Sequence, residues 1–299
     1  MENLAKRRAT TKPALAAENT AIAAADTTME TSFGAESTTT KTVTVFDIPA
    51  LLHTLRDQSS DDAAILLAIR GFRRLLSVEK APPAAEVLSC GALPLFVRLL
   101  EHHNDDVIFE AAWALTNVAS TEHTAAVVEC GAVPYLVRLL MAANENVREQ
   151  SAWCLGNIAG DCPELRDIVL HAGAMDPVLK NIQHPSNKSL LGNMVWTLSN
   201  FCRGKPQPEM SLVQASLPHL LSIVQSNPNK DIVIDACWAF SYLCDGEDDR
   251  IQQVMDIGAT KKLVEFLSDS STALVAPALR TLGNFVSGND QQTQVRGND

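Results

Sequence analysis

Hydrophobic residues recur in this chain at the spacing of helices, and the pattern itself repeats about every 42 residues. In the segment AAWALTNVAS, Ala111, Leu115 and Val118 stand at positions i, i+4 and i+7, so they share one face of a helix. Later segments repeat this stripe, with Leu155, Leu198, Phe240 and Leu282 at the position of Leu115. The pattern therefore predicts one helix in each period that buries an equivalent stripe.

Each period also contains two shorter helical segments, in phrases such as VLSCGALPLFVRLL and VVECGAVPYLVRLL. Glycine ends the first short helix, and proline stands in the first turn of the next one, where its missing N–H costs nothing. These glycines are Gly91, Gly131, Gly173 and Gly258, and the prolines are Pro94, Pro134, Pro177 and Pro218. Three helices per period are typical of armadillo repeats. We therefore expect an all-α protein, a right-handed α-solenoid of about six armadillo repeats over residues 46–299, the last one incomplete.

Residues 1–45 have a different composition, rich in Ala and Thr with almost no large apolar side chains. Such a segment cannot bury enough surface to fold, so we expect a disordered tail that carries the basic cluster Lys6, Arg7 and Arg8. The formal net charge of the chain is -11, and the charges of the tail cancel, so the acidic excess belongs to the repeats. That excess argues against nucleic acid as a ligand and favours basic partners.

A second pattern lies on the opposite face of the same helices, about 200° from the apolar stripe at roughly 100° per residue. A tryptophan is followed four residues later by an amide or a phenol. A row of large aromatic side chains away from the core indicates a repeated binding surface. The pairs are Trp113 with Asn117, Trp153 with Asn157, Trp196 with Asn200, and Trp238 with Tyr242, and Arg280 with Asn284 continues the register.

These side chains suit an extended cationic ligand. Indole faces attract ammonium and guanidinium groups, so two neighbouring tryptophans make a slot for a lysine or arginine side chain. An asparagine amide donates and accepts, so it can pair with the backbone of a peptide that crosses the helices. Three residues before each tryptophan the same exposed face adds a polar side chain, and the carboxylates of Asp161, Asp235 and Glu110 would select for positive charge. These preceding positions are Glu110, Gln150, Asn193 and Asp235.

Other functional classes find little support in the residues. The histidines show no HExxH spacing, and no nucleotide-binding glycine loop is present, so we expect neither an enzyme nor a bound cofactor or metal. The seven cysteines lack paired metal spacing, which indicates reduced thiols in an intracellular protein. No apolar run is long enough to cross a membrane. A binding protein remains the best interpretation.

Five consecutive segments resemble the armadillo repeats of importin-α, the adaptor for nuclear localisation signals: AAWALTNVAS, SAWCLGNIAGD, VWTLSNFCRGK, DACWAFSYLCDG and PALRTLGNFVSGND. The resemblance extends from about Phe46 to Asp299 and includes the replacements Tyr242 and Arg280. It implies an import adaptor that binds Lys/Arg-rich signals of cargo proteins, links them to importin-β and shuttles between cytoplasm and nucleus. The alternative is a general armadillo scaffold that binds another extended partner.

The resemblance also implies the residues of two peptide grooves, with Asp161 pairing with a ligand lysine and Thr124 at the edge. The major groove would comprise Trp113, Asn117, Gln150, Trp153, Asn157, Asp161, Asn193, Trp196, Asn200, Asp235, Trp238 and Tyr242. The opening of the minor groove would comprise Arg280, Asn284, Val286 and Asp290.

Two departures from the family concern the ends of the chain. The family's N-terminal importin-β-binding segment is long and basic, whereas only Lys6, Arg7 and Arg8 resemble it here. That triplet resembles an autoinhibitory cluster, and an inert charged tail is the alternative. The chain also stops earlier than the family does, so we expect a sequence truncated at both ends.

Overall fold

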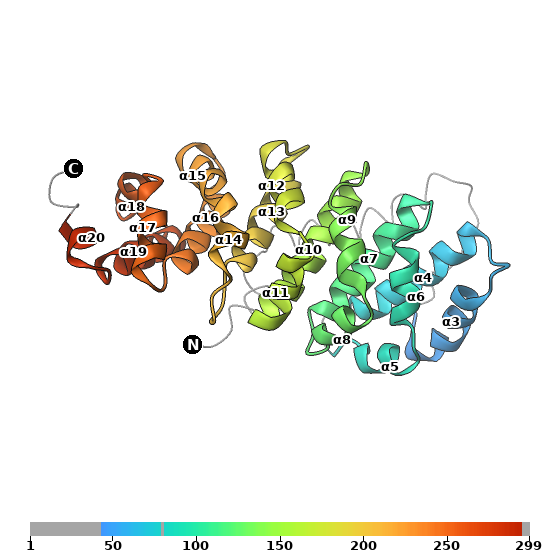
Figure 1. Ribbon diagram of the computed structural model, residues 1–299. Helices are drawn as coiled ribbons and strands as arrows, with labels where there is room; N and C mark the ends of the chain where they lie inside the picture. Colours follow the sequence, from blue (N-terminus) through green and yellow to red (C-terminus); the bar gives the residue numbers. More distant parts are fainter. Residues whose placement is uncertain (1–42, 79–80, 295–299) are drawn as a thin grey trace. The chain divides into compact units, whose positions relative to one another are not determined.

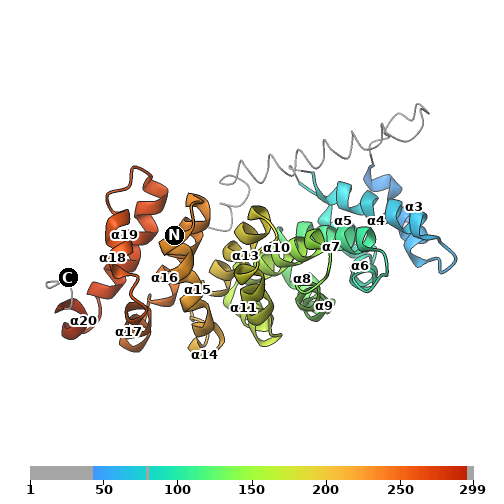
Figure 2. The same cartoon turned by 90° about the horizontal axis from the view of Figure 1, so that it is seen from above.

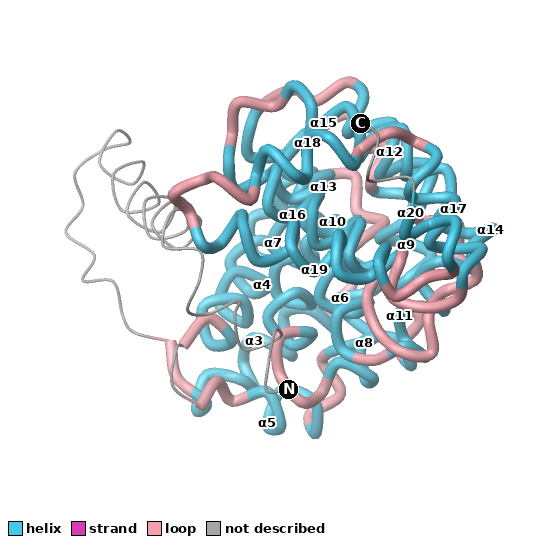
Figure 3. Tube along the Cα trace, turned by 90° about the vertical axis from the view of Figure 1, so that its left-hand side faces the viewer, coloured by secondary structure: helices cyan, strands magenta, loops and turns pink. Residues whose placement is uncertain are grey.

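A computed structural model describes residues 43–78 and 81–294, and this part of the chain contains helices and loops but no strand (Figures 1 and 3). The predicted all-α class is therefore confirmed. The helices are η1 (Val45–Asp47), α3 (Ile48–Arg56), α4 (Asp62–Leu76), α5 (Ala84–Ser89), α6 (Leu93–Leu99), α7 (Asp105–Ala119), α8 (Thr124–Glu129), α9 (Ala132–Leu139), α10 (Glu145–Asp161), α11 (Pro163–His171), α12 (Met175–Gln183), α13 (Lys188–Phe201), α14 (Met210–Val213), η2 (Gln214–Ser216), α15 (Leu217–Ser226), α16 (Lys230–Leu243), α17 (Asp248–Asp256), α18 (Thr260–Phe266), α19 (Thr272–Val286) and α20 (Asp290–Gln294).

The helices form successive layers of two short helices followed by a long one. The long helices pack on one another in chain order, α4 on α7, α7 on α10, α10 on α13, α13 on α16 and α16 on α19 (Figure 2). Each long helix also packs on the short helix that precedes it, as α9 does on α10 and α12 on α13. This is the predicted armadillo arrangement, and it brings equivalent positions of successive repeats side by side.

The apolar stripes supply the core between the layers. Leu115, Leu155, Leu198 and Phe240 are all fully buried, as the spacing predicts. The long helices α7, α10, α13 and α16 begin at asparagine caps, for example where the Asn187 side chain accepts a hydrogen bond from the Leu190 backbone N–H at 2.8 Å. Local sequence thus defines where these helices start, and burial of the stripe fixes which face points inward.

The turn between the two short helices depends on glycine. Gly131 and Gly173 have φ angles of 78° and 82°, in the left-handed region that costs other residues free energy. The chain turns there between the first and the second short helix of the repeat. The glycine pattern in the sequence therefore predicted these turns correctly.

The predicted disordered tail and the predicted number of repeats remain expectations from the sequence. The basic cluster Lys6, Arg7 and Arg8 lies outside the described residues, as does most of the segment 1–45. The division into a tail and about six repeats stays a prediction. Within the described residues, no helix is both long and apolar enough to cross a bilayer.

Candidate peptide-binding ladder

The four tryptophans occupy equivalent positions on neighbouring long helices. Trp113 lies on α7, Trp153 on α10, Trp196 on α13 and Trp238 on α16, and each ring is half-buried. The rings are thus neither part of the core nor fully exposed. We call these four tryptophans, with Asn117, Asn157, Asn200 and Tyr242 one turn later, the ladder.

The asparagines of the ladder join consecutive helices. Nδ2 of Asn157 donates to the Thr116 carbonyl oxygen at 3.1 Å, and Nδ2 of Asn200 donates to the Gly156 carbonyl oxygen at 2.9 Å. Asn284 repeats this contact with Ser241 at 2.9 Å. One amide hydrogen of each therefore holds the stack together, a role that the sequence pattern did not predict. The second hydrogen and the oxygen are the groups that a ligand would use.

The side-chain oxygen of Asn157 is buried without a hydrogen-bond donor in the described part of the chain. The residue is 2% exposed, and its Oδ1 accepts no hydrogen bond from any described residue. A buried acceptor without a donor costs free energy.

The polar residues three positions before each tryptophan are more buried than the helical pattern predicted. Glu110, Gln150 and Asn193 are 3%, 6% and 2% exposed, whereas Asp235 is half-buried. Nε2 of Gln150 donates to Thr116 Oγ1 at 2.8 Å. The expectation that Glu110 is an exposed selector of charge is therefore wrong. A single-helix wheel places these residues beside the tryptophan, but the preceding long helix covers them.

Two carboxylates lie near the central rungs. Asp161, the last residue of α10, is exposed, and Thr124 Oγ1 lies 3.3 Å from its Oδ1. Glu149 accepts hydrogen bonds at 2.6 Å from Ser189 Oγ and from Asn193 Nδ2. The sequence analysis missed Glu149, although an acid one turn before Trp153 was a visible signal. Both acids belong to α10, so they place negative charge around the Trp153 rung.

The C-terminal end of the ladder carries a cation from the protein itself. The Arg280 Cζ lies 6.0 Å from the Trp238 ring centroid and 5.8 Å from that of Tyr242. Its Nη2 pairs with Asp245 Oδ2 at 3.0 Å, and Lys205 Nζ pairs with Asp245 Oδ1 at 3.0 Å. Burial opposes charge on Asp245, but the hydrogen bonds from Lys205 and Arg280 outweigh it and hold the pKa of this carboxyl below its ordinary value.

The residues predicted to open a minor groove lie beyond this point. Arg280, Asn284 and Val286 are all on α19, and Asp290 is the first residue of α20. Arg280 and Val286 are exposed, and Asn284 is half-buried. They share one end of the described stack, and their binding of a peptide stays a prediction.

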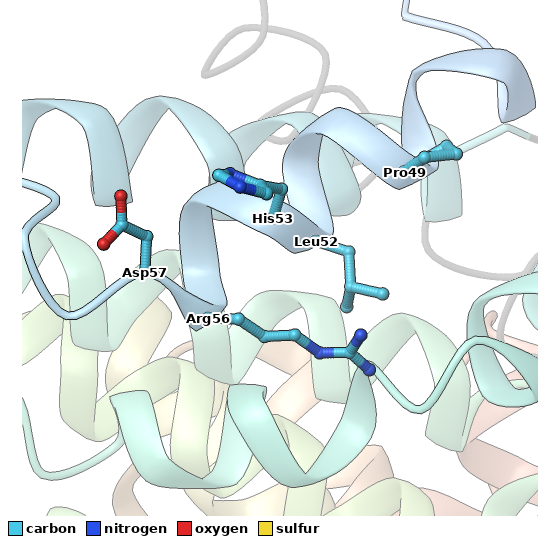
Figure 4. A pocket seen from close by; sticks show the side chains of 5 residues that line it. All are labelled: Pro49, Leu52, His53, Arg56 and Asp57. Atoms are coloured by element: carbon cyan, nitrogen blue, oxygen red, sulfur yellow. The ribbon is translucent and has the colours of Figure 1, made fainter.

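Two other features lie away from the ladder. Asp62, His102 and His103 converge, with the Nε2 of His103 2.7 Å from Asp62 Oδ2, but the Asn104 backbone N–H donates to Nδ1 of His102. That bond places the His102 proton on Nε2, where a metal ion would need a lone pair. A shallow pocket beside α3 contains none of the predicted site residues, and it is lined by Pro49, Leu52, His53, Arg56 and Asp57 (Figure 4).

Stacked layers of three helices, with side chains at equivalent positions of successive layers, define an armadillo-repeat protein. The profile of the Armadillo/beta-catenin-like repeat matches residues 80–120, 120–160 and 205–245. Among solved structures, a designed armadillo repeat protein in complex with the peptide (KR)4 covers 80% of the chain, and 99% of its own chain is matched. It has a TM-score of 0.73 and 25% identity.

The chain belongs to the importin-α family, as the resemblance of its repeats indicated. Importin subunit alpha-1a of Oryza sativa subsp. japonica is 48% identical over 239 residues, which are 79% of this chain and 45% of the rice protein. Importin subunit alpha-B of Dictyostelium discoideum is 46% identical over 246 residues, or 81% and 47% of the two chains. The chain spans about half the length of the curated relatives that it matches.

Proposed function

We propose that the ladder binds lysine- and arginine-rich nuclear localisation signals of cargo proteins, and that the chain acts as a nuclear import adaptor. The observation that carries this proposal is the equivalent placement of Trp113, Trp153, Trp196 and Trp238 on packed long helices. Half-buried indoles at equivalent positions give a series of similar sites, which suits a ligand made of similar residues.

The spacing of the helices suits an extended strand. Packed helices lie about 8–10 Å apart, which is the length of two to three residues at roughly 3.3 Å each. Alternate side chains of the ligand would therefore reach successive slots between indoles. Cations in those slots gain from the indole faces, by about 0.5–2 kcal/mol each according to how well water is excluded.

The charges around the central rungs support selection for cations. Asp161 and Glu149 flank Trp153, and Thr124 orients the Asp161 carboxylate at 3.3 Å. The proposed pairing is between Asp161 and a ligand lysine. Because Asp161 is exposed, its attraction is screened by salt, and affinity should fall as ionic strength rises.

The asparagines would hold the ligand backbone. One N–H of Asn157 and one of Asn200 already bind the preceding helix, which fixes the orientation of each amide. An amide held in this way presents its oxygen and remaining hydrogen to a strand without further loss of side-chain entropy. Binding through the backbone is independent of sequence, so the indoles and acids would supply the specificity.

Several parts of the proposal follow from the family. Delivery of cargo to importin-β, shuttling between cytoplasm and nucleus, absence of enzymatic activity and autoinhibition by Lys6, Arg7 and Arg8 are proposed on that ground. A second candidate function is a general armadillo scaffold, which the fold also supports. The solved complex of a designed armadillo repeat protein with the peptide (KR)4 supports a basic peptide as the ligand.

Titration of a fluorescently labelled Lys/Arg-rich peptide tests the proposal. We expect a Kd of about 1 μM or lower that weakens with added salt. The double variant Trp153→Ala, Asp161→Lys should abolish binding with no loss of helicity, whereas Asp176→Lys, an exposed position on α12, should have little effect. Unchanged affinity in the double variant rejects the ladder as the site, and equal binding of a scrambled acidic peptide favours the scaffold function.

A further inference from the structure

Two carboxylates follow long helices of the ladder at nearly the same place. Asp161 is the last residue of α10, and Asp245 lies just beyond the end of α16. Arg280 Nη2 lies 3.0 Å from Asp245 Oδ2. The same guanidinium lies 6.0 Å from the Trp238 ring and 5.8 Å from the Tyr242 ring. Asp245 is therefore beside the fourth rung of the ladder, as Asp161 is beside the second.

The two acids differ in their partners. The Thr124 hydroxyl lies 3.3 Å from Asp161 Oδ1, and among the described residues no cation lies within ion-pair distance of this carboxylate. Asp245 has two cationic partners, Lys205 Nζ at 3.0 Å from Oδ1 and Arg280 Nη2 at 3.0 Å from Oδ2. A lysine of the protein thus occupies one oxygen of Asp245, and a lysine is the residue that Asp161 is proposed to bind in a ligand.

Lys205 comes from the preceding repeat, and its loop is held on both sides. The loop 202–209 joins α13 to α14. On one side, Nη1 of the fully buried Arg166 donates to the Arg203 carbonyl oxygen at 2.7 Å. On the other side, Gln207 Nε2 donates to a carbonyl oxygen of α16 at 2.7 Å. The placement of Lys205 beside the fourth rung is therefore built into the fold.

The ion pair between Lys205 and Asp245 is accessible to a ligand. The two side chains are 67% and 29% exposed, so water and salt screen their attraction. A ligand cation that takes the place of Lys205 breaks one exposed ion pair and makes another. The exchange therefore adds little affinity as long as Lys205 keeps its charge.

We propose that Asp245 is a further cation site of the ladder, which Lys205 occupies in the free protein and which a lysine or arginine of a longer basic ligand takes over. The inference rests on the proposed function and extends its ligand over α16. Arg280 keeps the second oxygen of Asp245. Lys205 acts as an internal competitor, and removal of its charge opens the site.

Peptides that share one Lys/Arg core test the inference. The core is extended at either terminus by Lys-Lys or by Ala-Ala, and each Kd is measured by fluorescence anisotropy. The ratio of the Ala-Ala Kd to the Lys-Lys Kd is the lysine gain at that terminus. At the terminus that lies over α16, Lys205→Gln should raise the lysine gain about twofold to fivefold, the effect of one exposed ion pair. Added salt should reduce this rise.

A double-mutant cycle assigns the rise to Asp245. Lys205→Gln frees Asp245 Oδ1, so it should raise the lysine gain in the parent protein but not in the Asp245→Asn background. Lys205→Ala repeats the test with a shorter side chain, so that a new contact of glutamine cannot imitate the result. The control Lys188→Gln removes the same charge from an exposed position at the start of α13 and should leave the lysine gain unchanged.

The outcomes separate the two proposals. If the core binds but neither Lys205 variant raises the lysine gain, or the rise is equally large in Asp245→Asn, the inference is overturned while the proposed function stands. An equal rise in Lys188→Gln also overturns it, because a general loss of positive charge then explains the effect. If the core binds no better than an acidic peptide of the same length, both proposals fall.

Discussion

Gly156 tests how closely the ladder depends on packing between long helices. A Cβ at this position of α10 would lie 2.4 Å from Cζ3 of Trp196 and 2.9 Å from Oγ1 of Thr197. Thr197 cannot move aside cheaply, because it is fully buried and its hydroxyl donates to the Ala152 carbonyl oxygen at 2.8 Å. The substitution Gly156→Ala should therefore displace the Trp196 ring or spread the two helices.

The size of the effect follows from two opposing contributions. Alanine is favoured over glycine by about 1 kcal/mol in a helix interior. Overpacking of a closely packed site costs about 1–3 kcal/mol. Gly192 offers a matched control, because a Cβ there would meet Ile232 at an ordinary 3.8 Å. We expect Gly192→Ala to be more stable than the parent by about 1 kcal/mol, and Gly156→Ala to lie about 1–3 kcal/mol below Gly192→Ala.

Urea unfolding followed by far-ultraviolet circular dichroism measures the difference. The first transition midpoint is the quantity to compare, because stacked repeats can unfold in steps. The same variants enter the peptide titration, where Gly156→Ala should weaken binding more than Gly192→Ala because it moves the Trp196 rung. Equal stability of the two variants would refute the close contact between Gly156 and Trp196.

Three further predictions concern single contacts. Asn200→Ala removes the hydrogen bond to the Gly156 carbonyl oxygen and should lower the unfolding free energy by about 1–3 kcal/mol in urea titrations. The control Asn146→Ala changes an exposed asparagine and should not show this loss. Asp245 has a lowered pKa, so its ion pairs stabilise the fold above its ordinary value of 3.8, and this stability is lost as pH falls through the lower native pKa. Asp245→Asn should therefore flatten the acid side of a pH profile of thermal unfolding, and an unaltered profile would contradict the assignment. Burial raises the pKa of the thiols of Cys202, Cys237 and Cys244 to about 12. Alkylation followed by mass spectrometry should therefore label the half-buried Cys90 in the native protein, and it should label these three cysteines only after unfolding.

Some site residues could be read from the sequence because their signal is periodic. Trp153 and Asn157 lie one turn apart on a helix whose opposite face is apolar, two other helices repeat the pair, and a third has tyrosine in place of asparagine. Glu149 has no such repetition, since its equivalents are Phe109, Gly192 and Ile234. A residue that occurs once cannot be distinguished by period, although it lies beside the same rung.

The inner neighbours of the ladder could not be predicted from one helix at a time. Glu110 and Gln150 share a face with the tryptophans on a helical wheel, yet each is covered by the preceding long helix. Arg70 and Arg74 occupy ladder positions with different residue types, so the repeat pattern passes over them. Their register follows from the hydrogen bond from Asn117 to the Arg73 carbonyl oxygen and from the burial of Ala68, Phe72 and Leu75.

The amino-acid sequence by itself determined the class of fold, the family and the row of tryptophans, because these depend on helix periodicity and on short motifs within one period. Tertiary structure decided which polar residues remain accessible, which amide hydrogens hold the stack, and where the protein supplies its own cations at Trp113 and Trp238. The physical reason is that exposure and ion pairing arise between helices about 40 residues apart, where small differences in register determine which side chains meet.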